Sequence, residues 1–164
     1  NTIYLHNLNI DNLTLIEYNK LGLSANFYEQ IPGKYLLHFE IDTILVSGKV
    51  DRFLKYDYIG APWPIECLRE LENKVGNSGL CIFNKESLIS CLKKVSYKPM
   101  AMDFFFSFYC SEYLNIAPFD IAKEFSVEGI YYNKPCGYHK PWQYFKENTQ
   151  EFEKICSDIE KLLK

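Results

Sequence analysis

The chain has 164 residues, of which 48% are hydrophobic and 24% are charged. At this length, such proportions exclude a disordered chain and predict one folded domain over residues 1–164. The formal net charge of −3 provides no basic surface for nucleic acid, and no uninterrupted apolar run approaches the ~20 residues that cross a bilayer.

Three further features set expectations about processing and location. The chain begins with asparagine rather than methionine, so we expect a piece of a longer protein. No signal-peptide pattern opens it, which favours a cytoplasmic location. The six cysteines include no C-x-x-C pair, and a chain of this length can build a core without cross-links, so we expect reduced and mostly buried thiols.

The first part of the chain predicts two helices and two strands. Thr14 and Glu17 have the spacing of a capping box, so a helix is expected from this point to about Leu23. Further elements expected here are a short strand at Ile3 and Leu5, a helix over 24–31 capped by Ser24, and a strand over 35–41 after Pro32-Gly33.

The remainder of the chain predicts strands that alternate with amphipathic helices. In chain order we expect a helical turn over 50–55, a loop through 61–64, a strand over 80–83, a helix over 86–95, a buried helix over 104–114, and a last helix that Asn148 and Glu151 cap. Alternation of this kind is typical of an α/β sandwich.

A pair of carboxylates stands at the end of the strand over 35–41. Side chains alternate between the faces of a strand, so Glu40 and Asp42 point to the same side at its carboxyl end. Ligands of open α/β sheets bind at this end. Two neighbouring carboxylates repel unless a cation lies between them, and Mn²⁺ or Mg²⁺ fits such a pair. The alternative is an exposed strand end with solvated charges.

Five segments, taken in order, carry more information than one pair of residues. They are Phe39-Glu40-Ile41-Asp42-Thr43, Tyr56-Asp57-Tyr58-Ile59-Gly60-Ala61-Pro62-Trp63, Val75-Gly76-Asn77-Ser78-Gly79-Leu80, Phe125-Ser126-Val127-Glu128 and Pro135-Cys136-Gly137-Tyr138-His139-Lys140-Pro141-Trp142. Over residues 18–142 the chain thereby resembles a glycosyltransferase-like domain family with the pattern FQxD, YDYIGAPW, GNGG, ED, FSxE and GxH. The resemblance implies a GT-A-like mixed sheet flanked by helices, a nucleotide-diphosphate sugar as donor, and a DxD-type metal site.

The resemblance also assigns metal ligands. It makes Asp42 the main ligand of the metal and of the diphosphate, with Glu40 in support where the family has Gln. Similar enzymes close the site with a histidine near the end of the domain, which implies that His139 reaches the same cation. For the other two histidines, His6 and His38, a structural role is expected.

A general base is implied at Asp103, which matches the acid of the family's ED pair. Such an aspartate takes the proton from the acceptor hydroxyl in an inverting transfer. The family's glutamate is replaced here by Met102, which puts full activity in doubt. The alternative is that Asp103 only caps a helix beginning at Phe104.

The remaining matched residues are assigned to donor or acceptor binding. They are Gly60, Trp63, Gly76, Asn77, Ser78, Gly79 and Glu128. Glycines allow backbone to approach a ligand, and an asparagine can hydrogen-bond sugar hydroxyls. The alternatives are an ordinary turn before the strand at Leu80, core packing for Trp63, and a structural role for Glu128.

Two hypotheses from different classes therefore stand. One is a transferase that moves a hexose or N-acetylhexosamine from a UDP-type donor to a glycan or protein hydroxyl. The other is a non-catalytic sugar- or partner-binding module that keeps the fold; a small structural metal domain is less favoured because no Cys/His set is present. Only about forty residues precede Asp42, so much of the N-terminal nucleotide-binding half of a GT-A fold is expected to be missing.

Overall fold

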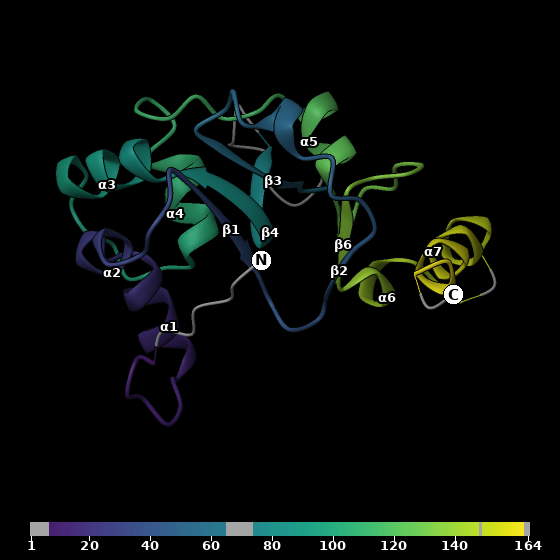
Figure 1. The fold of residues 1–164 in the computed structure, drawn as a ribbon, viewed down its shortest axis with the longest axis horizontal. Helices are drawn as coiled ribbons and strands as arrows, with labels where there is room; N and C mark the ends of the chain where they lie inside the picture. Colours follow the sequence, from purple (N-terminus) through teal and green to yellow (C-terminus); the bar gives the residue numbers. More distant parts are fainter. Residues whose placement is uncertain (1–6, 65–73, 148, 163–164) are drawn as a thin grey trace.

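The computed structural model describes residues 7–64, 74–147 and 149–162, and it forms a mixed α/β domain. Two small three-stranded sheets lie side by side, and helices flank them (Figure 1). The α/β prediction is thereby confirmed. The strands are divided between two sheets rather than gathered in one.

The first sheet is antiparallel throughout and has the order β1-β4-β3. Its strands are β1 (Tyr35–Phe39), β3 (Tyr58–Pro62) and β4 (Val75–Asn84). The central strand β4 is buried on both faces, because an unbroken run of apolar residues from Leu80 to Phe83 occupies it. A strand with two buried faces requires helices on both sides of the sheet.

Helices cover both faces of this sheet. On one face, Phe83 packs with side chains of α2 (Ala25–Glu29), α3 (Lys85–Lys94) and α4 (Met102–Phe108), next to the end of α1 (Leu15–Gly22). On the other face, Ile82 packs with the 3₁₀ turn η1 (Asp51–Phe53) and with α5 (Phe119–Phe125). The sheet is thus the middle layer of a sandwich, as the alternation of elements predicts.

The second sheet has the order β2-β6-β5. Strand β2 (Thr43–Leu45) is antiparallel to β6 (Gly137–His139), and β5 (Ser126–Val127) is parallel to it. After β6, the short helix α6 (Pro141–Tyr144) leads to α7 (Gln150–Glu160), which packs Ile155 against Val127 and Tyr138. This sheet carries His139 to the first sheet, where its ring lies against Gly79 of β4.

Several predicted elements have the expected positions and caps. Glu17 N donates to Thr14 Oγ1 at 3.3 Å and Thr14 N donates to Glu17 Oε2 at 2.8 Å, so the capping box is present. Residues 7–42 contain α1, α2 and β1, with no strand–helix–strand unit among them. The strand expected at Ile3 and Leu5 lies outside the described residues.

Other predictions of local structure were wrong. Ala61 and Pro62 belong to β3 rather than to a loop, because β3 is an edge strand and a proline can end such a strand. The helix predicted over 104–114 begins at Met102 and ends at Phe108. Strand β1 ends at Phe39, before the carboxylates, and the N-cap of α7 is Thr149, while the predicted cap Asn148 lies outside the described residues.

The expectation of fully reduced cysteines was also wrong. Cys91 on α3 and Cys110 just after α4 form a disulfide, with their Cα atoms 6.2 Å apart. The two helices pack together on one face of the sheet, and this tertiary proximity is invisible in the spacing of the cysteines. Cys81 and Cys136 are free and buried, and Cys156 is free and half-buried, as expected.

The membrane prediction agrees with the structure as far as it is described. Among these residues, no helix combines the length and the apolar character needed to cross a bilayer.

Candidate metal site

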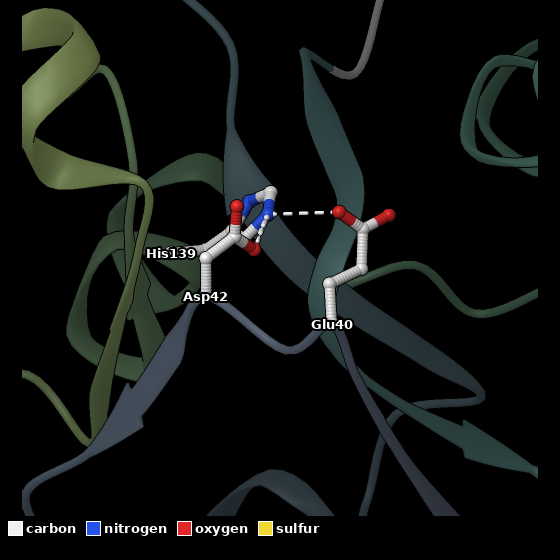
Figure 2. Close-up of side chains that lie close together, drawn as sticks. All are labelled: Glu40, Asp42 and His139. Atoms are coloured by element: carbon white, nitrogen blue, oxygen red, sulfur yellow. Dashed lines mark hydrogen bonds and ion pairs between the residues drawn. The ribbon is translucent and has the colours of Figure 1, made fainter.

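The candidate site lies at the junction of the two sheets. Glu40 and Asp42 occupy the short link from β1 to β2, and His139 ends β6 (Figure 2). Glu40 N donates to Gly79 O of β4 at 2.9 Å, which ties the link to the first sheet. Thr43 pairs with His139 in the second sheet, so the β2–β6 register places the imidazole beside Asp42.

The three side chains converge on one small volume. His139 Nε2 lies 3.1 Å from Glu40 Oε2 and 3.3 Å from Asp42 Oδ1. One ligand atom from each residue falls within 4.8 Å of the other two. The imidazole is buried, with 4% of its side chain exposed, whereas the carboxylates are about 30% exposed. Solvent therefore reaches the cluster from the carboxylate side.

These residues fit a divalent cation. Asp42 Oδ1 is buried and makes no hydrogen bond among the described residues, although it lies within ion-pair distance of His139 Nε2. A buried oxygen without a hydrogen bond is unfavourable unless a ligand satisfies it. Two carboxylate oxygens and one imidazole nitrogen are donors that Mn²⁺ accepts. The geometry thus provides a cation position bounded by Glu40, Asp42 and His139.

Lys140 partly neutralises the cluster. Its Nζ lies 2.8 Å from Glu40 Oε2 and 3.7 Å from Asp42 Oδ2. A hydrogen bond from His139, followed by the bond and charge of Lys140, lowers the pKa of Glu40 to about 2 even though burial opposes the shift. Burial alone would lower the pKa of His139, but its bonds to Glu128 and Glu40 raise that pKa to about 9.

The charges in the cluster do not balance. Among the described residues, three carboxyl groups, of Glu40, Asp42 and Glu128, form ion pairs with two basic groups, of His139 and Lys140. The cluster therefore keeps an excess of acid that favours a bound cation.

Glu128 lies on the other side of the imidazole. Its Oε2 is 2.9 Å from His139 Nδ1, and Tyr144 OH donates to its Oε1 at 3.2 Å. The residue directly follows β5 and is buried. The structure thus places Glu128 behind the histidine rather than on the side of the two other carboxylates.

Gly79 forms a wall of the site. A Cβ atom on this residue would overlap the imidazole ring of His139. Its carbonyl oxygen accepts from Thr43 Oγ1 at 2.8 Å as well as from Glu40 N. The glycine is therefore required where the two sheets meet. Through Gly79, the segment Gly76-Asn77-Ser78-Gly79 lies against the candidate site.

The other residues predicted to bind donor or acceptor lie along β3 and β4. A Cβ on Gly60 would overlap the backbone of Asn77, and one on Gly76 would overlap Ser107. Asn77 Oδ1 accepts from Gly79 N at 3.2 Å. These contacts explain the small residues by close packing, and the binding roles stay predictions, as they do for the two remaining members, Ser78 and Trp63.

Asp103 lies in the first turn of α4 rather than at its cap, because the N-cap is Ala101. The interpretation as a helix cap was therefore wrong, although its carboxylate accepts from Phe104 N at 2.7 Å. Burial raises the pKa of Asp103, the bond from Phe104 opposes this, and the charges of Glu128 and Glu40 raise the pKa further.

Two residues of the cluster, Lys140 and Tyr144, were not assigned any role from the sequence. Lys140 directly follows His139, and its left-handed backbone, with φ 44°, directs its side chain to the carboxylates. The adjacency of the two residues was the only available signal. Tyr144 reaches Glu128 through α6, and sequence spacing offers no indication of that contact.

Replacing Gly79 with alanine should destabilise the fold and the site together. The added methyl group meets a ring that Glu128 holds in place, so we expect a loss of about 1–3 kcal/mol in the free energy of unfolding. Gly48→Ala is the matched control, because a Cβ there meets nothing within 4 Å. Thermal unfolding of the two variants measures the difference, and equal melting temperatures would contradict the packing argument.

Fold and site together define a mixed α/β domain with a carboxylate–histidine cluster suited to a divalent cation. The model of a family described as protein of unknown function (DUF5672) matches residues 3–139, so the chain belongs to this family. The match includes Glu40, Asp42, Glu128 and His139. Neither the curated proteins nor the solved structures yielded a match.

Proposed function

We propose that the chain is a metal-dependent, GT-A-like glycosyltransferase domain. It would move a hexose or N-acetylhexosamine from a UDP-type nucleotide-diphosphate sugar to a glycan or protein hydroxyl, with inversion at the anomeric carbon. The proposal rests on the cluster of Glu40, Asp42 and His139, in which the buried Oδ1 of Asp42 makes no hydrogen bond among the described residues. The order of the chain's motifs supports a transfer reaction, because it resembles the pattern of glycosyltransferase-like domains.

The cluster supports Mn²⁺ more strongly than Mg²⁺. Mg²⁺ prefers an all-oxygen octahedron, whereas the nitrogen of His139 suits a transition metal. When bound, such an ion acts as a Lewis acid that stabilises the departing diphosphate. Glu40 and Asp42, which lie on the more exposed side of the cluster, would hold the ion together with His139.

Asp103 is the proposed general base. Burial raises its pKa, and a base is most effective when its pKa approaches the working pH. The negative charges of Glu128 and Glu40 raise the pKa of Asp103 further. In this role its carboxylate takes the proton of the acceptor hydroxyl.

A specific observation also favours the non-catalytic alternative. Met102 stands where the glycosyltransferase-like pattern that the chain resembles has a glutamate, and it is buried with its sulfur against Gly22. The position thus serves the core and offers no second carboxylate beside Asp103. A module that binds a sugar nucleotide without transferring the sugar would tolerate this replacement.

Binding and product analysis test both hypotheses. UDP is titrated into the protein by calorimetry with Mn²⁺ and with a chelator, and a panel of UDP-sugars is incubated with hydroxyl acceptors for mass spectrometry. We expect Mn²⁺-dependent binding of UDP and a glycosylated product. Binding without product would favour the module, and metal-independent behaviour in both assays would reject the proposed function.

A further inference from the structure

We propose that Glu128 is a positioning residue for the metal site. It would hold the imidazole of His139 with the proton on Nδ1, so that the lone pair of Nε2 faces the cation position. The inference deepens the proposed function and rests on it, because it concerns how one ligand is oriented. It replaces the acceptor-side role that the sequence analysis considered for Glu128.

Hydrogen bonding fixes Glu128 and the histidine as a unit. Glu128 Oε2 lies 2.9 Å from His139 Nδ1, with only 6% and 4% of the two side chains exposed. Tyr144 OH donates to the second carboxylate oxygen at 3.2 Å. An ionised carboxyl group is unfavourable in a buried place unless it is hydrogen-bonded. Both oxygens of Glu128 have a partner, so the side chain is held in this orientation.

Strand pairing sets the distance between Glu128 and His139. The parallel strands β5 and β6 pair Val127 with Tyr138. Glu128 and His139 are the next residues on each strand, so their backbones are also neighbours. The contact therefore follows from the sheet and does not depend on a flexible loop.

The imidazole has little freedom to turn away from this orientation. Gly79 packs directly against its ring, and Nε2 points to Glu40 and Asp42 (Figure 2). A cation that binds Nε2 would displace the proton from that nitrogen, so the imidazole would keep a single proton. An acceptor at Nδ1 keeps the proton there and leaves Nε2 for the cation. In metal sites, mutation of a residue that hydrogen-bonds to a metal ligand typically changes the affinity for the metal by ~10–100-fold.

A double-mutant cycle separates positioning from simple attraction by charge. A buried carboxylate also attracts Mn²⁺ through space, and that effect would persist without the histidine. We therefore compare the Mn²⁺ dissociation constants of the wild type, Glu128→Gln, His139→Gln and the double variant by calorimetry. Glu124→Gln on α5 controls for the loss of one negative charge, because Glu124 pairs with Arg52 rather than with the site.

We expect Glu128→Gln to weaken Mn²⁺ binding by ~10–100-fold in the wild-type background and to have little effect once His139 is replaced. Glu124→Gln should bind Mn²⁺ like the wild type. If Glu128→Gln weakened Mn²⁺ binding by the same factor with and without His139, Glu128 would act by attraction of charge. That result would overturn the positioning role. An unchanged affinity of Glu128→Gln would also overturn it, with the proposed function left standing.

A spectroscopic measurement reports the orientation directly. Nitrogen NMR of the Zn²⁺-loaded wild type should show His139 protonated at Nδ1, and Glu128→Gln should show a mixture of tautomers. Circular dichroism verifies that each variant is folded. A wild type that binds neither Mn²⁺ nor Zn²⁺ would reject the metal site itself, and the role of Glu128 with it.

Discussion

Replacing Asp42 with asparagine should abolish Mn²⁺-dependent binding of UDP. The substitution keeps the shape of the side chain but removes its negative charge, and Oδ1 of Asp42 is buried without a hydrogen bond among the described residues. Mutation of a residue that only supports a metal ligand typically lowers the affinity for the metal by ~10–100-fold. Loss of a charged ligand itself should therefore lower it by about 10²-fold or more. Calorimetry with Mn²⁺ and UDP measures the effect.

The matched control is Asp51→Asn, which removes an exposed acid from the turn η1. It should bind Mn²⁺ like the wild type, and both variants should remain folded by circular dichroism. If Asp42→Asn kept its affinity for Mn²⁺, the assignment of the cluster as a metal site would fail. Residual metal-independent binding of UDP would instead indicate contacts elsewhere on the domain.

The candidate site illustrates how far the sequence can lead. Glu40, Asp42 and His139 were predicted to meet, and the structure brings them together. Alternation along a strand does not explain the position of the two acids, because β1 ends at Phe39 and the acids lie in a link between the sheets. Their convergence depends on the β2–β6 pairing, which joins residues almost a hundred positions apart. Strand periodicity describes local geometry and carries no information about such a pairing.

The features missed from the sequence depend on tertiary contacts. Lys140 is drawn to the carboxylates by their charge, and the disulfide joins helices that meet only in the folded core. Part of β3 was mistaken for a loop because Pro62 is typical of turns. The strand accepts this proline because β3 lies at the edge of its sheet. In β3, packing in the sheet overrides the local preference of proline for turns.

Replacing Asp103 with asparagine should slow transfer while making the protein more stable at neutral pH. Asparagine keeps the size of the side chain and an oxygen for Phe104 N, but it cannot take a proton. Turnover should therefore fall by about 10²-fold or more, with little change in the affinity for UDP. Product formation by mass spectrometry and calorimetry of UDP measure the two quantities.

The pH dependence of stability distinguishes a strained functional acid from a structural one. Burial raises the folded-state pKa of Asp103 above its ordinary value, so the folded state binds its proton more tightly than the unfolded state. The wild type consequently loses stability, relative to Asp103→Asn, as the pH rises from about 3 to 7. Asp120→Asn is the matched control, because Asp120 holds the same second position in α5 but is exposed.

Thermal unfolding across this range should show an advantage of Asp103→Asn that grows with pH, and Asp120→Asn should show none. An acid that destabilises its own fold at the working pH is expected where its charge is used in chemistry. A variant that transfers sugar at the wild-type rate would remove Asp103 from the mechanism. The opposite pH trend is also informative. If the stability of Asp103→Asn, measured against the wild type, fell between pH 3 and pH 7, the charge of Asp103 would stabilise the first turn of α4.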